Sequence, residues 1–326
     1  MTDQVYINFV VETKFLSDGT KKTYLTKLKK IQTEIMPKPI DYILHHPEEF
    51  DQMVRTFAQN TRGRTGQSLG AHTIDSYFSA VISLFLYNQT LREKNHELFL
   101  KWKRLHEAVR QPINDKYKSN EPTERQQQAY LDFDQVVKIR DSLPVGSYEK
   151  LLIMLYTEIP PVRSDYYRTH IVTQFPGEAK ESESENENEN MLIIDEKTSH
   201  IVLSKYKTAK KYGVIMIETT PELHLEIIES LIRYPRDYLF VGADGKPYQM
   251  ENTFNKWANR TLKRIYNRQH FSLTMLRHIY ISRRDLKLEE KSGLEQEQIA
   301  KIMGHSIEQQ RRYLWHSWLK KYEPSP

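Results

Sequence analysis

Three short stretches near the end of the chain carry most of its information: TMLRH at residues 274–278, MGHS at 303–306 and RRY at 311–313. Taken singly, an arginine, a histidine or a tyrosine most often packs or caps. Taken together in this order, the three residue types suit covalent attack on a phosphodiester. In that chemistry a tyrosine hydroxyl is the nucleophile, and cationic or hydrogen-bonding groups stabilise the negative charge that grows on the phosphate.

Local patterns around these stretches predict how the histidine and the tyrosine are held. Residues 295–303 have the apolar spacing of a helix, and a capping-box pattern beginning at Ser306 predicts a second helix that runs to about Lys320. His305 then lies in the joint between the two helices. Tyr313 lies about two turns into the second helix, roughly 10 Å along its axis from the cap, so both side chains can face one pocket. An ordinary apolar stripe on a terminal helix is the alternative.

The stretches 276–278 and 303–306, with the following Tyr313, resemble the C-terminal signature of the tyrosine recombinases, the superfamily of the phage integrases, Cre and Xer. The resemblance implies another arginine, after a buried helix early in the catalytic domain. Residues 151–156 read LLIMLY and have the pattern of that helix, and the PPVRSD stretch that follows supplies Arg163. The catalytic residues implied so far are Arg163, Arg277, His305 and Tyr313.

The resemblance also implies a lysine on a β-hairpin between the two arginines. Residues 201–217 have the pattern of that hairpin. Lys207 is the best match for the catalytic lysine, and Lys210 is second. Family members usually carry histidine or lysine three residues before the second arginine, where this chain has Thr274. Either Thr274 is a weaker hydrogen-bond donor there, or His270 reaches in from outside the motif.

Each residue type has a role in this chemistry. A free tyrosine has a pKa near ~10, so it attacks poorly unless its proton is removed or its phenolate is stabilised. Arg163 and Arg277 would clamp the nonbridging phosphate oxygens with paired N–H donors. The lysine would protonate the departing 5′ oxygen, while His305 would hydrogen-bond the phosphate or manage the proton of the nucleophile. The resemblance implies a 3′-phosphotyrosyl intermediate that conserves bond energy, so no metal, nucleotide cofactor or ATP is needed.

The composition is compatible with an intracellular protein. A chain of 326 residues is long enough for two domains. It has no cysteine, which excludes disulfides, thiolate metal sites and cysteine nucleophiles. Neither a signal pattern nor a membrane-spanning apolar run is found. We therefore expect a soluble protein with no membrane partner, located wherever its target DNA resides, in the nucleus or at a viral replication site.

The charge is unevenly distributed. The net charge is +5, yet residues 177–190 hold six glutamates and only one lysine, so the rest of the chain is more basic than the total indicates. A basic surface attracts the phosphate backbone of nucleic acid. The candidate DNA-binding residues are Arg62, Arg64, Lys256, Arg260, Lys263, Arg264 and Arg268. A merely solvated helical face is the alternative for the run that begins at Lys256.

Helical patterns and polar breaks predict two domains. Residues 1–110 have the pattern of a helical bundle similar to the family's core-binding domain, which clamps DNA. Residues 111–130 are polar, contain prolines and predict a linker, and residues 131–326 form the catalytic domain. Within it, the acidic insertion at 176–190 is expected to be disordered. The expected fold is mainly α with a small antiparallel β-sheet.

Three functions fit these features. The first is a site-specific recombinase or integrase, from a eukaryotic virus or a mobile element. The second is a type IB topoisomerase, whose N-terminal region should contain β-structure. The third is a noncatalytic DNA-binding relative. For the first, the partners are double-stranded DNA and further copies of the chain, as a tetramer on DNA, because recombination between two duplexes needs four cuts. Trp315, Trp318 and Leu319 either contact a neighbouring copy or pack into their own core.

Overall fold

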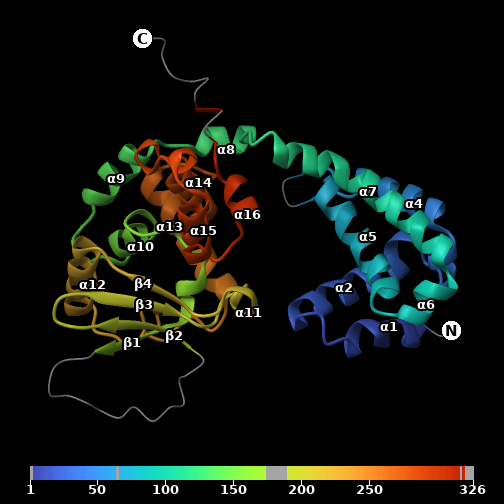
Figure 1. Ribbon diagram of the computed structural model, residues 1–326, viewed down its shortest axis with the longest axis horizontal. Coiled ribbons are helices and arrows are strands. Elements are labelled where there is room, and N and C mark those ends of the chain that lie inside the picture. The colour runs from blue at the N-terminus through green and yellow to red at the C-terminus, as the bar shows by residue number, and fades with distance from the viewer. Residues whose placement is uncertain (1–2, 64–65, 174–188, 316–317, 320–326) are drawn as a thin grey trace. The chain divides into compact units, whose positions relative to one another are not determined.

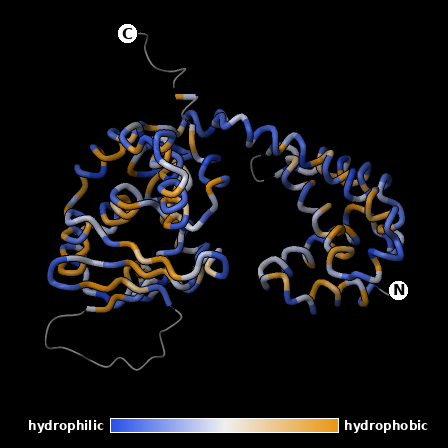
Figure 2. The backbone as a smooth tube through the Cα atoms, in the orientation of Figure 1, coloured by the Kyte–Doolittle hydropathy of each residue, from blue (hydrophilic) through white to orange (hydrophobic). Residues whose placement is uncertain are grey.

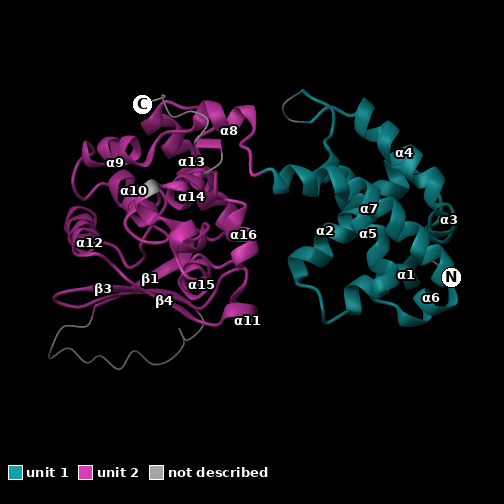
Figure 3. Cartoon of the chain, turned by 45° about the horizontal axis from the view of Figure 1, so that its top comes forward, with its two compact units in different colours: residues 1–119 teal, residues 120–326 magenta. Residues whose placement is uncertain are grey.

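The chain divides into two compact units, Met1–Ser119 and Asn120–Pro326 (Figure 3). The structure is a computed structural model that describes residues 3–63, 66–173, 189–315 and 318–319, the side chain of Arg284 apart. In that part of the chain, no helix is both long and apolar enough to cross a bilayer.

The described residues of the first unit form helices and no strand. The helices are α1 (Asp3–Glu12), α2 (Asp18–Lys30), α3 (Ile40–His45), α4 (Pro47–Asn60), α5 (Ala71–Leu86), α6 (Gln89–Lys94) and α7 (His96–Lys118), with a π-helical turn (Ile31–Ile35) after α2. Aromatic packing between α4, α5 and α7 holds the core together: the ring centroid of Phe50 lies 5.2 Å from that of Phe78 and 5.0 Å from that of Trp102. The predicted helical bundle is confirmed.

The linker expected at 111–130 is largely helical. Helix α7 continues to Lys118 with Pro112 inside it, and α8 (Glu124–Ala129) follows after a short break. The boundary between the two units falls between Ser119 and Asn120, inside the range predicted for the linker. Polar residues with good helix propensity continue an amphipathic helix as readily as they form a linker, so composition did not distinguish the two.

The second unit packs helices against one face of a small sheet (Figure 1). Its strands are β1 (Thr169–Thr173), β2 (Asn190–Ile194), β3 (Ser199–Leu203) and β4 (Ile215–Glu218). Its helices after α8 are α9 (Phe133–Asp141), α10 (Tyr148–Thr157), α11 (Ala209–Tyr212), α12 (Pro221–Arg233), α13 (Glu251–Tyr266), α14 (Leu273–Ser282), α15 (Gly293–Ile302) and α16 (Ile307–Arg311), with 3-10 turns at Asp165–Arg168, Arg284–Leu286 and Leu288–Glu290.

The sheet has the order β1-β2-β3-β4 and is mixed. The β2–β3 and β3–β4 pairs are antiparallel, and the latter is the predicted hairpin. Strands β1 and β2 are parallel, which corrects the expectation of a wholly antiparallel sheet. Parallel neighbours need a long connection, and the sequence supplies one, because the predicted acidic insertion lies between these strands. Leu192 and Ile194 of β2 and Ile201 and Leu203 of β3 are buried in the core of this unit, and Figure 2 shows hydrophobic colour along the sheet.

The predicted disordered insertion falls almost entirely on residues 174–188, outside the described part of the chain. Its last two residues, Glu189 and Asn190, are exceptions, and Glu189 accepts a hydrogen bond from Arg168 at 2.8 Å. Asn190 begins β2, is buried, and donates from Nδ2 to the carbonyl of Asp165 at 2.9 Å. Its Oδ1 accepts from the backbone N–H groups of Ser204 and Lys205. This asparagine joins the segment after Arg163 to the start of the β3–β4 connection, so it is an ordered structural residue.

Helices α10 and α14 form the centre of this unit. Ser147 caps α10 and Ser272 caps α14, and the residues that follow are buried around nearly the whole helix. Trp315 and Trp318 belong to the same core, with ring centroids 6.3 Å apart and both near Tyr130. Both tryptophans therefore pack within their own unit.

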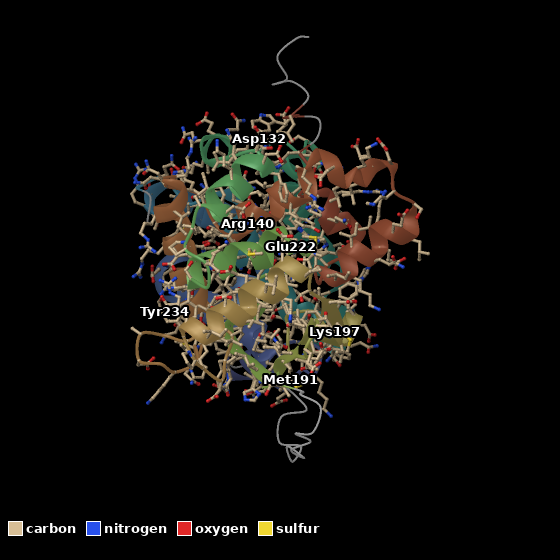
Figure 4. All side chains as sticks on the ribbon, turned by 90° about the vertical axis from the view of Figure 1, so that its left-hand side faces the viewer. Asp132, Arg140, Met191, Lys197, Glu222 and Tyr234 are labelled. Carbon is tan, nitrogen blue, oxygen red and sulfur yellow. The ribbon has the colours of Figure 1, made fainter. Side chains whose placement is uncertain are left out.

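A buried arginine fastens α9 to the end of α10. Arg140, labelled in Figure 4, donates to the hydroxyl of Thr157 at 2.8 Å and forms ion pairs with Asp141 and Glu158. Because the desolvated guanidinium has three partners, its burial is compensated. This network fixes the start of the segment that leads from α10 to Arg163.

Candidate functional site

Both predicted arginines donate hydrogen bonds to one short turn. Arg277, on α14, donates from Nη2 to the carbonyl of Met303 at 3.2 Å. Arg163, in the segment after α10, donates from Nη1 to the carbonyl of Gly304 at 3.0 Å. This turn ends α15 and leads directly to His305. Three of the predicted residues, far apart in the sequence, are therefore joined through two adjacent carbonyl groups.

The turn depends on its glycine. Gly304 has a φ of +66°, in the left-handed region that favours glycine after a helix. Thr208, in the connection between β3 and β4, donates from its hydroxyl to the carbonyl of Gly304 at 2.8 Å. That carbonyl thus accepts from both Arg163 and Thr208. The hairpin connection and the segment after α10 are consequently held against the same turn.

Tyr313 lies against the cluster formed by Arg163, Arg277 and the turn at Gly304 and His305. Its ring centroid is 4.7 Å from Cζ of Arg277 and 5.5 Å from the ring centroid of His305. The prediction that Tyr313 is two turns into a long helix is wrong: Ser306 does cap a helix, but α16 ends at Arg311. Tyr313 follows in a turn, where its N–H donates to the carbonyl of Gln310 at 2.9 Å. Packing of the chain after Arg311 into the core decides this end, and helical propensity does not.

His305 is buried and neutral. Burial, with the charge of Arg277 next in importance, lowers its pKa from the ordinary 6.5 to about 3. Its Nδ1 lies 3.1 Å from the carbonyl of Ser306, so Nδ1 carries the hydrogen of the neutral ring. Nε2 is buried without a partner among the described residues. The imidazole therefore presents a free acceptor lone pair near Tyr313.

Arg277 also has unused hydrogen-bonding capacity. It is 2% exposed, and its Nε has no partner in the described part of the chain. Burial lowers the pKa of this guanidinium, yet arginine remains charged at any working pH. A buried cation with an unsatisfied donor is poised to bind an anion.

Asp165 is a buried residue of the site that the sequence reasoning missed. Burial, and then Glu251, raise the pKa of Asp165 from 3.8 to about 6, while Arg163 and Arg277 lower it. The neighbouring Ser164 donates to a carboxylate oxygen of Glu251 at 2.5 Å. The position of this carboxyl two residues after Arg163 was visible in the sequence, but its proximity to Arg277 was not. Asp165 offsets part of the positive charge of the arginine pair.

The predicted lysines lie near the cluster without a contact to it in the described structure. Strand β3 ends at Leu203, so Lys207 lies in the connection between β3 and β4. Lys207 lies between Tyr206 and Thr208 in the chain, and both of these neighbours pack against Gly304. A Cβ atom placed on that glycine would lie 3.5 Å from the ring of Tyr206 and 3.6 Å from the hydroxyl oxygen of Thr208. The side chains of Lys207 and Lys210 are exposed. An exposed flexible ammonium beside the turn can reach a substrate bound there.

The two residues considered for the motif histidine are both exposed. Thr274 is in the first turn of α14, and His270 precedes that helix. Neither has a hydrogen bond to the cluster in the described structure. The choice between them stays open.

Five of the predicted DNA-binding residues lie on or just after α13. Its apolar face is buried through Phe254, Ala258 and Leu262. The opposite face is exposed and carries Lys256, Arg260, Lys263 and Arg264, and the exposed Arg268 follows the helix. Arg264 is partly engaged, donating to Glu149 at 2.7 Å. Their DNA contacts remain a prediction.

In the first unit, Arg62 is exposed and its backbone pairs with Ser68, whereas Arg64 lies outside the described residues. A second basic element of this unit, in which Lys22 and Lys29 are exposed, was not considered. Helix α2 carries Lys21, Lys22, Lys27, Lys29 and Lys30 against Asp18 as its acidic residue. Counting lysines over the range of α2 would have found it.

Among the described residues, no cluster of three or more His, Cys, Asp or Glu side chains could hold a metal ion. The arrangement instead combines two cationic donors, Arg163 and Arg277, with a free imidazole acceptor and a tyrosine. Such a set suits a phosphate group.

Comparison with known proteins identifies the fold. Neither a protein-family model nor a curated protein matches this sequence. Among solved structures, the chain is similar to the Tn1549 transposon integrase in complex with transposon right end DNA, with 16% identity over 100% of this chain and 96% of that chain and a TM-score of 0.56. It is also matched to the XerA recombinase, with 15% identity over 99% of this chain and 100% of that chain, at a TM-score of 0.40. The chain has the tyrosine recombinase fold: N-terminal helices followed by a mainly helical region with a small mixed sheet.

Proposed function

We propose that this protein is a site-specific DNA recombinase or integrase that cleaves and rejoins DNA through Tyr313. One observation carries the proposal: Arg163 and Arg277 donate to adjacent carbonyls of the turn before His305, and the ring of Tyr313 lies against Arg277. A core packed for stability alone would not gather two cationic side chains, because burying charge without a carboxylate partner in hydrogen-bonding contact is unfavourable.

In the proposed reaction, Oη of Tyr313 attacks a phosphorus atom of the DNA backbone, and the bond between that phosphorus and the 5′ oxygen breaks. The phenol proton passes to an acceptor, for which the candidate is the free Nε2 of His305, whose ring centroid lies 5.5 Å from that of Tyr313. Lys207, or Lys210 in its place, donates a proton to the departing 5′ oxygen. The products are a 3′-phosphotyrosyl enzyme and a free 5′ hydroxyl.

Arg163 and Arg277 stabilise the transition state. Their N–H donors would shift from the turn carbonyls, or use their free positions, to bind the nonbridging oxygens as charge accumulates there. Rejoining runs these steps in reverse: a 5′ hydroxyl from the same or another strand attacks the phosphotyrosine, and the tyrosine leaves. The number of phosphoester bonds is unchanged in each step, so no energy source is consumed.

The substrate proposed is double-stranded DNA. The exposed basic face of α13 would contact backbone phosphates, as would Arg62 and the lysines of α2. The similar integrase was crystallised with transposon DNA, which supports a role in the movement of a DNA element. A tetramer on paired sites would supply four cuts. Such a protein would act inside the cell, where its target DNA resides.

A suicide DNA substrate tests the proposal. A nick just beyond the cleavage site lets the short fragment that carries the new 5′ hydroxyl diffuse away, so the covalent adduct accumulates and is measured as a mass shift. We expect an adduct at Tyr313 with the wild-type chain and none with Tyr313→Phe, which should still bind DNA. An adduct that persists in Tyr313→Phe would overturn the assignment of the nucleophile. Relaxation of supercoiled DNA without strand exchange would favour the topoisomerase alternative, although the helical first unit argues against it.

A further inference from the structure

Two side chains of α14 hold the backbone of Tyr313. Nδ1 of His278 lies 3.1 Å from the carbonyl oxygen of Tyr313, and the hydroxyl of Ser282 donates to the same oxygen at 3.2 Å. His278 and Ser282 are four residues apart, so they lie one above the other on the same face of the helix. The carbonyl of Tyr313 is therefore bound from two successive turns of α14.

The same two residues also bind the chain just beyond the tyrosine. The N–H of Trp315 donates to the hydroxyl oxygen of Ser282 at 2.9 Å. The indole of Trp315 stacks on the imidazole of His278, with ring centroids 3.9 Å apart and an interplanar angle of 12°. Ser282 thus donates to residue 313 and accepts from residue 315. This closed arrangement fixes the chain on the C-terminal side of Tyr313.

The clamp formed by His278, Ser282 and Trp315 is buried: the three residues are 7%, 5% and 2% exposed. A buried carbonyl and a buried N–H both need partners, and here each has one. Because the acceptor is a carbonyl, Nδ1 of His278 carries the hydrogen. Burial lowers the pKa of His278 to about 4, so the ring is neutral at physiological pH and adds no charge beside Arg277.

The position of the clamp gives it a specific consequence. Arg277, the proposed phosphate ligand, is the residue directly before His278 on α14. One rigid helix therefore carries both the group that would bind the phosphate and the groups that hold the backbone of the nucleophile. No regular helix holds Tyr313 itself, since α16 ends two residues earlier. Without the clamp, the distance between Tyr313 and the phosphate would vary with every motion of this segment.

We infer that His278 and Ser282 are positioning residues that hold the Tyr313 nucleophile in line with the phosphate bound by Arg277. The inference rests on the proposed function. Both side chains bind the carbonyl of Tyr313, so they would act through the backbone of the nucleophile. Misplacement of a nucleophile by about 1 Å can slow a reaction by on the order of 10²-fold. The loss should appear in the cleavage step and leave DNA binding unchanged.

Matched substitutions separate the hydrogen bond from the ring. His278→Asn keeps an N–H donor close to the place of Nδ1 but loses the stack, whereas His278→Phe keeps the stack and loses the donor. Ser282→Ala removes both hydrogen bonds, and Ser282→Thr restores a hydroxyl. Ile227→Ala, in the core at α12, is the control for destabilisation alone. DNA affinity, single-turnover adduct formation and thermal stability are measured for each variant well below its melting temperature.

We expect His278→Phe and Ser282→Ala to form adduct about 10- to 100-fold more slowly than the wild type with unchanged DNA affinity. His278→Asn and Ser282→Thr should retain most of the rate. The double variant should be no slower than the slower single variant, because both residues act on one carbonyl. Adduct formation at the wild-type rate in Ser282→Ala and His278→Phe would overturn the inference, as would losses that merely follow stability as in Ile227→Ala.

Hydrogen exchange gives a readout that does not depend on catalysis. In Ser282→Ala the amide of Trp315 loses its acceptor, so deuterium uptake of a peptide covering residues 311–315 should rise, and Ile227→Ala should leave it unchanged. Unchanged uptake in Ser282→Ala would contradict the clamp even if the wild-type chain formed no adduct. Absence of adduct in the wild type, with increased uptake in Ser282→Ala, would instead reject the proposed function and leave the structural clamp standing.

Discussion

Cζ of Arg277 lies 4.7 Å from the ring centroid of Tyr313, so the proposed phosphate ligand and the proposed nucleophile are in direct contact. A cation over an aromatic face is attracted by the ring quadrupole. The same charge would also stabilise a phenolate. This contact makes the roles of the two residues separately testable.

Replacing either arginine by lysine keeps the charge and removes the planar fork. In Arg277→Lys and Arg163→Lys we expect adduct formation to fall by on the order of 10²-fold or more, while DNA affinity changes little. Single-turnover cleavage and equilibrium binding measure the two effects. Equal losses in cleavage and binding would mean that the arginines hold DNA and do not stabilise the transition state.

The general acid can be identified by chemical rescue. A substrate with sulfur at the bridging 5′ position leaves without protonation, so it should restore cleavage to a variant that lacks the general acid. We expect rescue of Lys207→Ala and none of Arg277→Ala. If Lys210→Ala is rescued and Lys207→Ala is already active, the role belongs to Lys210.

Burial of a neutral histidine makes stability depend on pH. The pKa of His305 is about 3 in the folded protein and near ~6.5 in an unfolded chain, so the unfolded state binds more protons between these values. Its contribution to stability is complete above about pH 6.5 and is lost as the pH falls toward 3. Denaturant unfolding at pH 7 and pH 5 should show a smaller acid loss for His305→Asn than for the wild type. Equal losses would show that His305 is not kept neutral by folding.

Gln310 is buried at 1% exposure, and neither its Oε1 nor its Nε2 has a partner among the described residues. An unsatisfied buried amide costs about 1–3 kcal/mol. Gln310→Leu, which is similar in size, should therefore raise the stability by about 1 kcal/mol, or roughly 2–4 °C in melting temperature. Gln310→Ala should lower it by leaving a cavity. A destabilised Gln310→Leu would imply that the amide has a partner in solution.

The basic face of α13 can be tested by salt dependence. Lys256→Ala with Arg260→Ala should weaken DNA binding and reduce the slope of log affinity against log salt by about 0.9 for each phosphate that the variant no longer neutralises. Lys197→Ala is the control, because it removes one positive charge from an exposed position elsewhere in the second unit (Figure 4). A slope that falls no further than in the control would remove α13 from the DNA-binding surface.

Local patterns in the sequence were sufficient for the two-part organisation, the helical first unit, the β3–β4 hairpin and the joint at Gly304. Each depends on short-range chemistry: apolar spacing, a capping serine, or a glycine with positive φ at a helix end. The order of arginine, histidine and tyrosine in the chain also predicted which side chains meet near that joint. The roles of the residues are still predictions.

Tertiary structure decided what local chemistry leaves undetermined. The linker expected at 111–130 is mostly helical, α16 ends at Arg311, and β1 runs parallel to β2, because each depends on what the segment packs against. The acid near the arginines, Asp165, and the clamp of His278 and Ser282 on Tyr313 join residues that are distant in sequence. A hydrogen bond across 35 residues, as between His278 and Tyr313, has no local signal, since only the folded core brings its two ends together.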